Sequence, residues 1–294
     1  MPPRKTARSR RLGKQLRRAR EDAQLSQETV VEHVNSLNPT RSLSTTILSR
    51  VESGLTRLET EQLGKLVEVL HLSRSAASEL EDLRRRAGER GWWQEYSDII
   101  PEPLEMLAEH GEDAITARTY DYAFVQGYLQ TRAYAEAVVD SARAFVRPLD
   151  VDRHVDLRMR RQKRLGDPDF EGLTAVMAED VLHRVVGGPP VMHEQLQHLL
   201  QLSRSATSKV TIQIYPRAAG ALPGTDNLII FTFPHPGDGE AVFVDSDTAS
   251  RIYEDERDPI RQATYTFDAA RAKALSARDS MDLIADLCKE YEQP

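Results

Sequence analysis

With 294 residues, 40% hydrophobic and 29% charged, the chain has the composition of a globular protein long enough for two domains. Its single cysteine, Cys288, excludes an internal disulfide and fits a reducing cytoplasm, and no apolar run approaches the roughly 18–20 residues of a membrane helix. Residues 1–90 hold 18 Lys and Arg against 12 Asp and Glu, whereas residues 91–294 hold 21 against 34. A basic region on an acidic protein favours one domain that binds a polyanion such as DNA.

The chain begins with a basic stretch. Residues 1–9 contain two prolines and show no hydrophobic periodicity, so we predict a disordered basic arm. The first twenty residues hold nine basic side chains and no acidic one. The arm can lie along a DNA groove or be a solvated tail, and we favour the DNA contact because of the helices that follow it, which are described next.

Residues 10–90 are predicted to form a helical domain around two short amphipathic helices. The first begins after Ser26, a favourable N-cap residue, and its apolar residues recur at helical spacing: Val30, Val31, Val34 and Leu37. The second begins after Ser44 and ends at Gly54, a typical residue just past a helix. Its polar side carries hydroxyls and an arginine, which suit the major groove of DNA: Ser44, Thr45, Thr46, Ser49 and Arg50.

Three motifs in this domain carry a family resemblance. They are LRRAR at 16–20, LSQE at 25–28 and LSRVESG at 48–54. Residues 12–72 resemble the phage-repressor-like (Xre-type) helix-turn-helix domain. The resemblance implies a compact helical fold that binds double-stranded DNA. The alternative is a helical interaction module that does not bind DNA.

The resemblance also implies roles for single residues. It implies that Gln27 binds a phosphate. It implies that Thr45 and Thr46 contact bases and that Arg50 makes a later contact from the same helix. It implies a structural ion pair between Arg20 and Glu52, which is costly to break from one side. The chain departs from the family pattern by extra residues around Asn35–Leu43, where Pro39 prevents a continuous helix. We expect a loop there, in which Arg41 contacts the DNA backbone.

Residues 91–103 are predicted to be a linker. The segment holds both tryptophans, and its two prolines, Pro101 and Pro103, are expected to interrupt regular structure. The tryptophans can dock two domains together or can cap the next core, and we favour the second interpretation.

Residues 104–294 are predicted to form an α+β domain. After an irregular start, the segment to residue 186 is expected to be mainly helical, with an extended stretch near 116–122 and an arginine-rich helix over 151–165. That helix can be a second nucleic-acid contact or an ion-paired surface, and we favour the surface. Alternating apolar residues then predict strands with short turns, and hence an antiparallel sheet. The expected strands are 173–179, 210–216, 228–234, 241–247 and 249–256, with helices at 191–203, 257–275 and 277–291.

This region resembles a second family. The matching stretches include VQGYLQTRAYA at 125–135, MRRQKRL at 159–165, AEDVLHRVVGG at 178–188 and VTIQIYP at 210–216. They resemble the antitoxin-like (WhiJ-type) domain of uncharacterised function that actinobacterial Xre-type regulators carry. The resemblance implies a transcriptional regulator, often encoded beside a small partner protein that modulates it.

Enzyme chemistry is not indicated. Glu179 and His183 are spaced for one helix face, but no second pair follows at metal-ligand spacing, and His193 and His198 are poorly placed to share a face. Cys288 is interpreted as a packed thiol. We expect no enzyme activity, no metal and no cofactor.

The loop at 215–224 leaves two interpretations open. Its prolines and glycines, beside four tyrosines, can line a ligand pocket, or the loop can be an ordinary hairpin connection, which we favour. The candidate pocket residues are Tyr120, Tyr122, Tyr128 and Tyr215.

The sequence therefore predicts a cytoplasmic, DNA-binding transcriptional regulator with an α+β fold. A single helix-turn-helix contacts few bases, so we expect a homodimer, held mainly by residues 104–294, on an inverted-repeat operator. A small partner protein or a ligand is expected to modulate it. The alternative function is an antitoxin-like module that binds and neutralises a partner protein.

Overall fold

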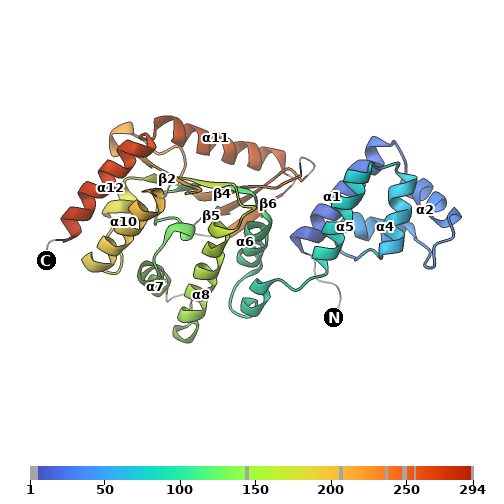
Figure 1. Cartoon of the computed structure of the whole chain (residues 1–294), viewed down its shortest axis with the longest axis horizontal. Coiled ribbons are helices and arrows are strands. Elements are labelled where there is room, and N and C mark those ends of the chain that lie inside the picture. The colour runs from blue at the N-terminus through green and yellow to red at the C-terminus, as the bar shows by residue number, and fades with distance from the viewer. Residues whose placement is uncertain are drawn as a thin grey trace. The chain divides into compact units, whose positions relative to one another are not determined.

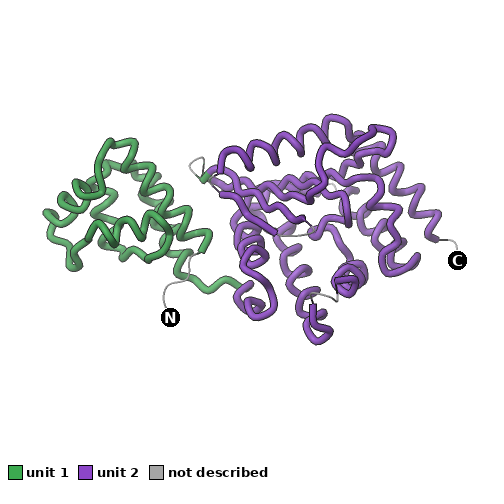
Figure 2. Tube along the Cα trace, turned by 180° about the vertical axis from the view of Figure 1, so that it is seen from behind, with its two compact units in different colours: residues 1–92, 235–238 green, residues 93–234, 239–294 purple. Residues whose placement is uncertain are grey.

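The computed structural model describes residues 6–142, 146–204, 208–235, 238–246, 250–254 and 256–292. The chain divides into two compact units, residues 1–92 with 235–238, and residues 93–234 with 239–294 (Figure 2). Helices make up the first unit, and helices with a six-stranded sheet make up the second, so the predicted α+β class is confirmed (Figure 1). Within the described ranges, no helix is both long and apolar enough to cross a membrane.

The first unit is a bundle of short helices around one apolar core. The helices are α1 (Ala7–Asp22), α2 (Gln27–Ser36), α3 (Thr45–Glu52), α4 (Thr60–Val69) and α5 (Arg74–Ala87). Serine N-caps start three of them, since the Ser26, Ser44 and Ser73 side chains each accept a hydrogen bond from a backbone N–H of the first turn. Each helix contributes leucine or valine to the core, which includes Leu16, Val34, Leu48, Leu66 and Leu83.

The predicted arm at 1–9 was too long. Residues 7–9 form the first turn of α1, because Thr6 and Ser9 make a capping box in which each side chain accepts a hydrogen bond from the other's backbone N–H. The Ser9 hydroxyl also donates to the Gly54 carbonyl at 2.9 Å. Residues 1–5 lie outside the described residues.

Gly13 sets how closely α1 packs on α3. A Cβ at this position would lie 2.4 Å from the Val51 carbonyl oxygen and 2.7 Å from that of Glu52. Both atoms belong to the backbone of α3, so a side chain could be accommodated only by moving the helix. Gly64 in α4 has no neighbouring atom within 4 Å of the equivalent Cβ position.

The second unit opens with structure where a linker was predicted. A 3₁₀ turn, η1, covers Trp92–Tyr96, and α6 (Glu102–Asp113) begins where the prolines were expected to stop regular structure. Pro101 is the N-cap and Pro103 lies in the first turn, where proline is tolerated because its missing N–H has no helical acceptor. Asp98 accepts hydrogen bonds from Arg153, and Glu95 accepts one from Arg160. Both arginines belong to α8 (Val151–Gln162), so arginines of that helix are ion-paired, as favoured above.

The sheet is mixed, which corrects the prediction of an antiparallel sheet. Its strand order is β3-β2-β1-β4-β5-β6. β1 (Thr116–Asp121), β2 (Gly172–Ala178) and β3 (Val210–Tyr215) run parallel, and β4 (Asn227–Thr232), β5 (Glu240–Asp245) and β6 (Ser250–Tyr253) continue antiparallel from β1. The alternating sequence pattern predicted each strand but not its partner. The parallel pairing of β1, β2 and β3 follows from the helices that lie between them in the chain, since parallel strands need such crossover connections.

Helices cover both faces of this sheet (Figure 1). On one face, α11 (Arg257–Lys273) packs against Tyr120, Val176 and Ile230 of three strands. On the other face lie α6, α7 (Arg132–Ser141), the short α9 (Asp180–His183), α10 (Pro189–Arg204) and α12 (Ala277–Glu292). α8 (Val151–Gln162) packs on α7 through a small apolar cluster. Short 3₁₀ turns η2 to η5 cover Gly127–Leu129, Pro148–Asp150, Lys163–Gly166 and Arg217–Ala219.

Gly13→Ala is expected to destabilise the first unit by about 1–3 kcal/mol, because the added methyl group collides with the rigid backbone of α3. Gly64→Ala is the matched control, and it should stabilise the unit by up to about 1 kcal/mol, since alanine favours a helix interior where space is available. Urea unfolding of both full-length variants, followed by circular dichroism and by hydrogen exchange of α1 and α3 amides, compares them. Equal effects of the two substitutions would show that the α1–α3 contact is not tight.

Candidate DNA-binding surface

α2 and α3 form a two-helix unit whose inner faces belong to the core. Val30 and Val34 of α2 and Leu48 and Val51 of α3 are buried. α3 ends at Glu52, and Gly54 follows with a φ of +70°, a left-handed conformation that glycine adopts without strain. The outer side of α3 is thereby fixed by the burial of its inner side.

The residues predicted to contact DNA are distributed along α2, the following loop and α3. Thr46, Ser49 and Arg50 are exposed, and Thr45 is half-buried. Ser44 is exposed, but its hydroxyl accepts a hydrogen bond from the Ile47 N–H and so caps the helix. No acidic residue occurs in the sequence from His33 to Val51, so this stretch adds no negative charge near a DNA phosphate.

A hydrogen-bonded ion pair fixes α3 against α1. Arg20 donates through Nε to Glu52 Oε1 at 2.7 Å and through Nη2 to Oε2 at 3.0 Å. The Arg20 side chain is 13% exposed and that of Glu52 4% exposed, and the hydrogen bond to Glu52 raises the pKa of Arg20. Loss of one partner would leave a nearly buried charge unpaired, at a cost of about 3–5 kcal/mol. Arg20 also donates to the Leu25 carbonyl, at the start of the turn into α2.

Gln27 joins this pair. Its Nε2 donates to Glu52 Oε2 at 2.8 Å, so the side chain expected on a phosphate is directed at the ion pair. A carboxamide nitrogen has two hydrogens, and the second is available to a phosphate oxygen without breaking the bond to Glu52. The structure thus brings Gln27, Arg20 and Glu52 together, which sequence reasoning did not anticipate for Gln27.

The two arginines of the predicted surface have local partners. Arg50 Nε donates to the Thr56 hydroxyl at 2.9 Å, which directs the guanidinium along the turn after α3. Arg41 Nη1 lies 3.4 Å from Glu59 Oε1, and its side chain is 77% exposed. Both arrangements leave other guanidinium N–H groups of these exposed side chains for solvent or a ligand.

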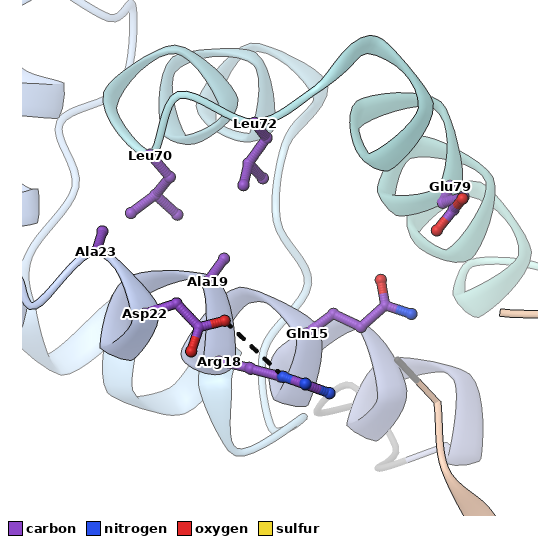
Figure 3. A pocket seen from close by; sticks show the side chains of 8 residues that line it. All are labelled: Gln15, Arg18, Ala19, Asp22, Ala23, Leu70, Leu72 and Glu79. Carbon is purple, nitrogen blue, oxygen red and sulfur yellow. Dashed lines mark ion pairs between the residues drawn. The ribbon is translucent and has the colours of Figure 1, made fainter. Parts of the chain in front are cut away.

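The first unit also has a groove, and Figure 3 shows the side chains that line it. Its volume is about 510 Å³, and its lining comes from α1, the turn after α4, and α5. The lining residues are Gln15, Arg18, Ala19, Asp22, Ala23, Leu70, Leu72 and Glu79. None of these residues belongs to α2 or α3, so the groove is not part of the candidate DNA surface.

The four tyrosines proposed for a ligand pocket do not line a common one. Tyr120 and Tyr215 belong to the core under α11, whereas Tyr128 belongs to the core on the opposite face of the sheet. Tyr122 is half-buried and packs at the border of both cores. The pocket prediction was wrong because Tyr128 lies in the turn η2 that follows β1, and it packs in the core opposite to that of Tyr120 and Tyr215.

Two of these tyrosines instead hold the loop that follows β3. The Tyr120 hydroxyl donates to the Gly224 carbonyl at 3.1 Å, and the Tyr215 hydroxyl donates to the Ala221 carbonyl at 2.8 Å. Burial raises the pKa of Tyr120 above its usual value. β3 and β4 are separated by β2 and β1, so the favoured hairpin interpretation of this loop was also wrong.

Side-chain amides hold the loop that follows β1. Gln130 Nε2 donates to the Val125 carbonyl at 2.6 Å, and its Oε1 accepts from Arg158 Nη1 at 2.7 Å. Gln195 of α10 donates to the Leu129 carbonyl and accepts from the Thr131 N–H. Burial lowers the pKa of Arg158 to about 10. The glutamines of the VQGYLQT stretch therefore complete backbone hydrogen bonds, a role that their spacing alone did not reveal.

Asp121, the last residue of β1, is the buried acid of this region. Gln126 Nε2 donates to both of its carboxyl oxygens, at 2.9 and 3.1 Å. Burial raises the pKa of Asp121 to about 7, and the nearby Asp245 carboxylate adds to the shift. The carboxyl group is therefore protonated in the folded protein at mildly acidic pH.

The residues considered for chemistry have other surroundings. His193 Nδ1 lies 3.0 Å from the Cys288 carbonyl oxygen and 3.6 Å from its Sγ, and burial raises the pKa of the Cys288 thiol. A thiol with a raised pKa is a poor nucleophile at neutral pH. His183 lies 3.4 Å from Glu179, and within the described ranges no three His, Cys, Asp or Glu side chains converge as metal ligands would.

Comparison with known families agrees with the division into two units. Residues 11–80 match the profile of a helix-turn-helix domain. Residues 104–286, well over half of the chain, match the profile of a domain of unknown function, DUF5753. The chain belongs to the DUF5753 family. No curated protein and no solved structure shows a significant match to it.

In this DUF5753 protein, the N-terminal helix-turn-helix domain is of the kind that binds DNA. The family match contains β1, the glutamine-held loop and Asp121.

Asp121→Asn is expected to change how stability depends on pH. Because the folded-state pKa of Asp121 is about 7 and the unfolded value is near 3.9, the wild type loses stability as pH rises from about 4 to 7. The asparagine variant lacks this loss, so it should gain on the order of 2 kcal/mol over the wild type between pH 5 and pH 8. Thermal unfolding at both pH values measures the gain.

Asp268→Asn, on the exposed side of α11, is the control and should leave the pH dependence unchanged. An Asp121→Asn variant that is destabilised equally at both pH values would contradict the buried, protonated state.

Proposed function

We propose that this protein is an Xre-type, sequence-specific transcriptional regulator that acts in the cytoplasm. In this proposal α3 enters the major groove, with Thr45, Thr46 and Arg50 as the base-reading residues. Ser44 and Ser49 assist at the edges of the contact, and Gln27 and Arg41 bind phosphates. The observation that carries the proposal is the outer side of α3, which presents hydroxyls and a guanidinium from a helix that the Arg20–Glu52 pair holds in place.

The side chains on α3 are of the right chemical types for reading bases. Threonine and serine hydroxyls accept or donate hydrogen bonds, and the threonine methyl contacts the methyl group of thymine. Arginine binds guanine through two hydrogen bonds. The positive charge of residues 1–90 supplies the sequence-independent part of the affinity, which falls with added salt.

We further propose that the protein acts as a homodimer held by residues 104–294. One short helix contacts too few bases for useful specificity, whereas two copies read two half-sites about one helical turn apart. Regulation by a small partner protein or a ligand through the DUF5753 domain is part of the proposal, in line with the antitoxin-like resemblance. An antitoxin-like role, in which the main activity is to bind and neutralise a partner protein, is the competing proposal.

Selection of bound duplexes from a random library, with the purified full-length protein at two salt concentrations, tests the proposed function. We expect an inverted repeat whose half-sites are separated by about one turn of DNA. Binding without any recovered motif, and lost at the higher salt, would show only the electrostatic component and would favour the antitoxin-like role.

Thr46→Ala is expected to weaken binding to the selected site by about 1–3 kcal/mol and to leave binding to random DNA nearly unchanged, because Thr46 contacts a base edge. Fluorescence anisotropy with both duplexes gives the two affinities. Thr29→Ala, on α2, is a control for a hydroxyl loss outside α3. Equal losses on the two duplexes would assign Thr46 to a phosphate instead.

A further inference from the structure

The loop between α2 and α3, residues 37–43, is held at its base by Asn35. The Asn35 side chain donates through Nδ2 to the Leu43 carbonyl at 2.9 Å and accepts from the Leu43 N–H, also at 2.9 Å. This pair of hydrogen bonds closes the loop, and the Leu43 side chain, 3% exposed, anchors its end in the apolar core. Asn38 takes the left-handed φ of +49° at which the chain reverses.

The tip of the same loop is attached to the start of α4. The Thr40 N–H donates to Glu61 Oε1 at 3.0 Å, and this bond lowers the pKa of Glu61. Gln62 is only 5% exposed, and its Nε2 donates to the Arg41 carbonyl at 3.3 Å. The loop thus has defined contacts at both ends and at its tip.

The loop runs directly into the N-terminus of α3. Ser42 and Ser44 are exposed on either side of the buried Leu43, so the chain enters α3 with alternate side chains directed outward. Thr40 and Arg41 continue this exposed stretch upstream. A ligand that reaches the first turn of α3 therefore meets the loop within a few residues, since two residues span at most about 7 Å.

We propose that the loop 37–43 is a preformed contact to a DNA phosphate beside the bases that α3 reads, with Arg41 as the contacting residue and Asn35 as the residue that positions it. The inference rests on the proposed function and adds how the extra residues between α2 and α3 contribute to DNA binding. Glu59 holds the Arg41 guanidinium when DNA is absent, and the phosphate replaces it as the partner in the complex.

The arrangement explains why the loop carries the contact. The start of α4 carries Glu59 and Glu61, whose charges oppose a phosphate at this position. Glu61 is occupied by the loop backbone, and Glu59 pairs with Arg41. The loop thus places an arginine and a backbone N–H against these two exposed carboxylates, so part of their negative charge is offset beside the proposed contact.

The test measures affinity against salt for the full-length protein on a random-sequence duplex. Arg41→Gln should weaken binding several-fold and reduce the slope of log affinity against log salt by about 0.9, the value for one phosphate contact. Asn35→Ala should give a similar loss, because the loop loses its closing bonds. Ser36→Ala is the matched control and should leave the slope unchanged, since the Ser36 hydroxyl donates to the His33 carbonyl within α2.

Two further variants separate positioning from direct contact. If Asn35 acts through Arg41, the double variant should lose no more affinity than Arg41→Gln alone. Glu59→Gln should strengthen binding, because the competing carboxylate is removed while an oxygen remains at the start of α4. Circular dichroism of each variant establishes that the helices are retained, and Gln62→Ala provides a second way to release the loop if Asn35→Ala unfolds the unit.

The outcomes are distinguishable. An unchanged salt slope for Arg41→Gln, with Thr46→Ala still selective for the preferred site, would overturn this inference and the Arg41–phosphate contact, and would leave the proposed base reading by α3 intact. A wild type that binds no duplex at any salt concentration would overturn both. An additive double variant would show that Asn35 supports the fold and does not position Arg41.

Discussion

The position of α3 depends on the bidentate pair between Arg20 and Glu52. Glu52 is the last residue of α3, and its carboxylate receives hydrogen bonds from Arg20 of α1 and Gln27 of α2. Three helices therefore meet at one carboxylate that is almost removed from solvent. The close approach at Gly13 brings the backbones of α1 and α3 near enough for this contact. Because buried charges are favourable only when fully paired, the network tolerates little rearrangement, and the outer side of α3 keeps a fixed orientation.

Local signals explain which parts of the fold could be predicted. The ends of α2 and α3 follow from Ser26, Ser44 and Gly54, whose capping roles depend only on adjacent residues. The strands were also predictable from their alternating pattern. Their order was not, because the pairing of β1 with both β2 and β4 joins segments more than fifty residues apart, and no local pattern records it. Similarly, Pro39 indicated a loop between α2 and α3. The attachment of this loop to α4 through Glu61 and Gln62 is a tertiary contact, which the local sequence does not indicate.

The candidate sites show the same division. Residues on the outer side of α3 were identified because their neighbours had to be buried, and burial of one helix face determines the other. The tyrosine pocket failed because Tyr128, in the turn after β1, packs in the core opposite to that of Tyr120 and Tyr215, and no local sequence pattern records this difference. Asp121 was not singled out at all: nothing in the sequence distinguishes a carboxyl group that burial keeps protonated from one that solvent keeps charged.

The connection that crosses from β3 over two strands to β4 has a consequence for the order in which the protein forms during synthesis. The parallel strands and this crossing connection require contacts between distant segments, whereas the first unit is a bundle of helices with mostly local contacts. Local topologies form faster, and the N-terminal part of a chain leaves the ribosome first. The helix-turn-helix unit can therefore reach its native state while the ribosome is still adding the strands of the sheet, so the nascent chain passes through a period in which its DNA-binding surface exists without the domain proposed to regulate it.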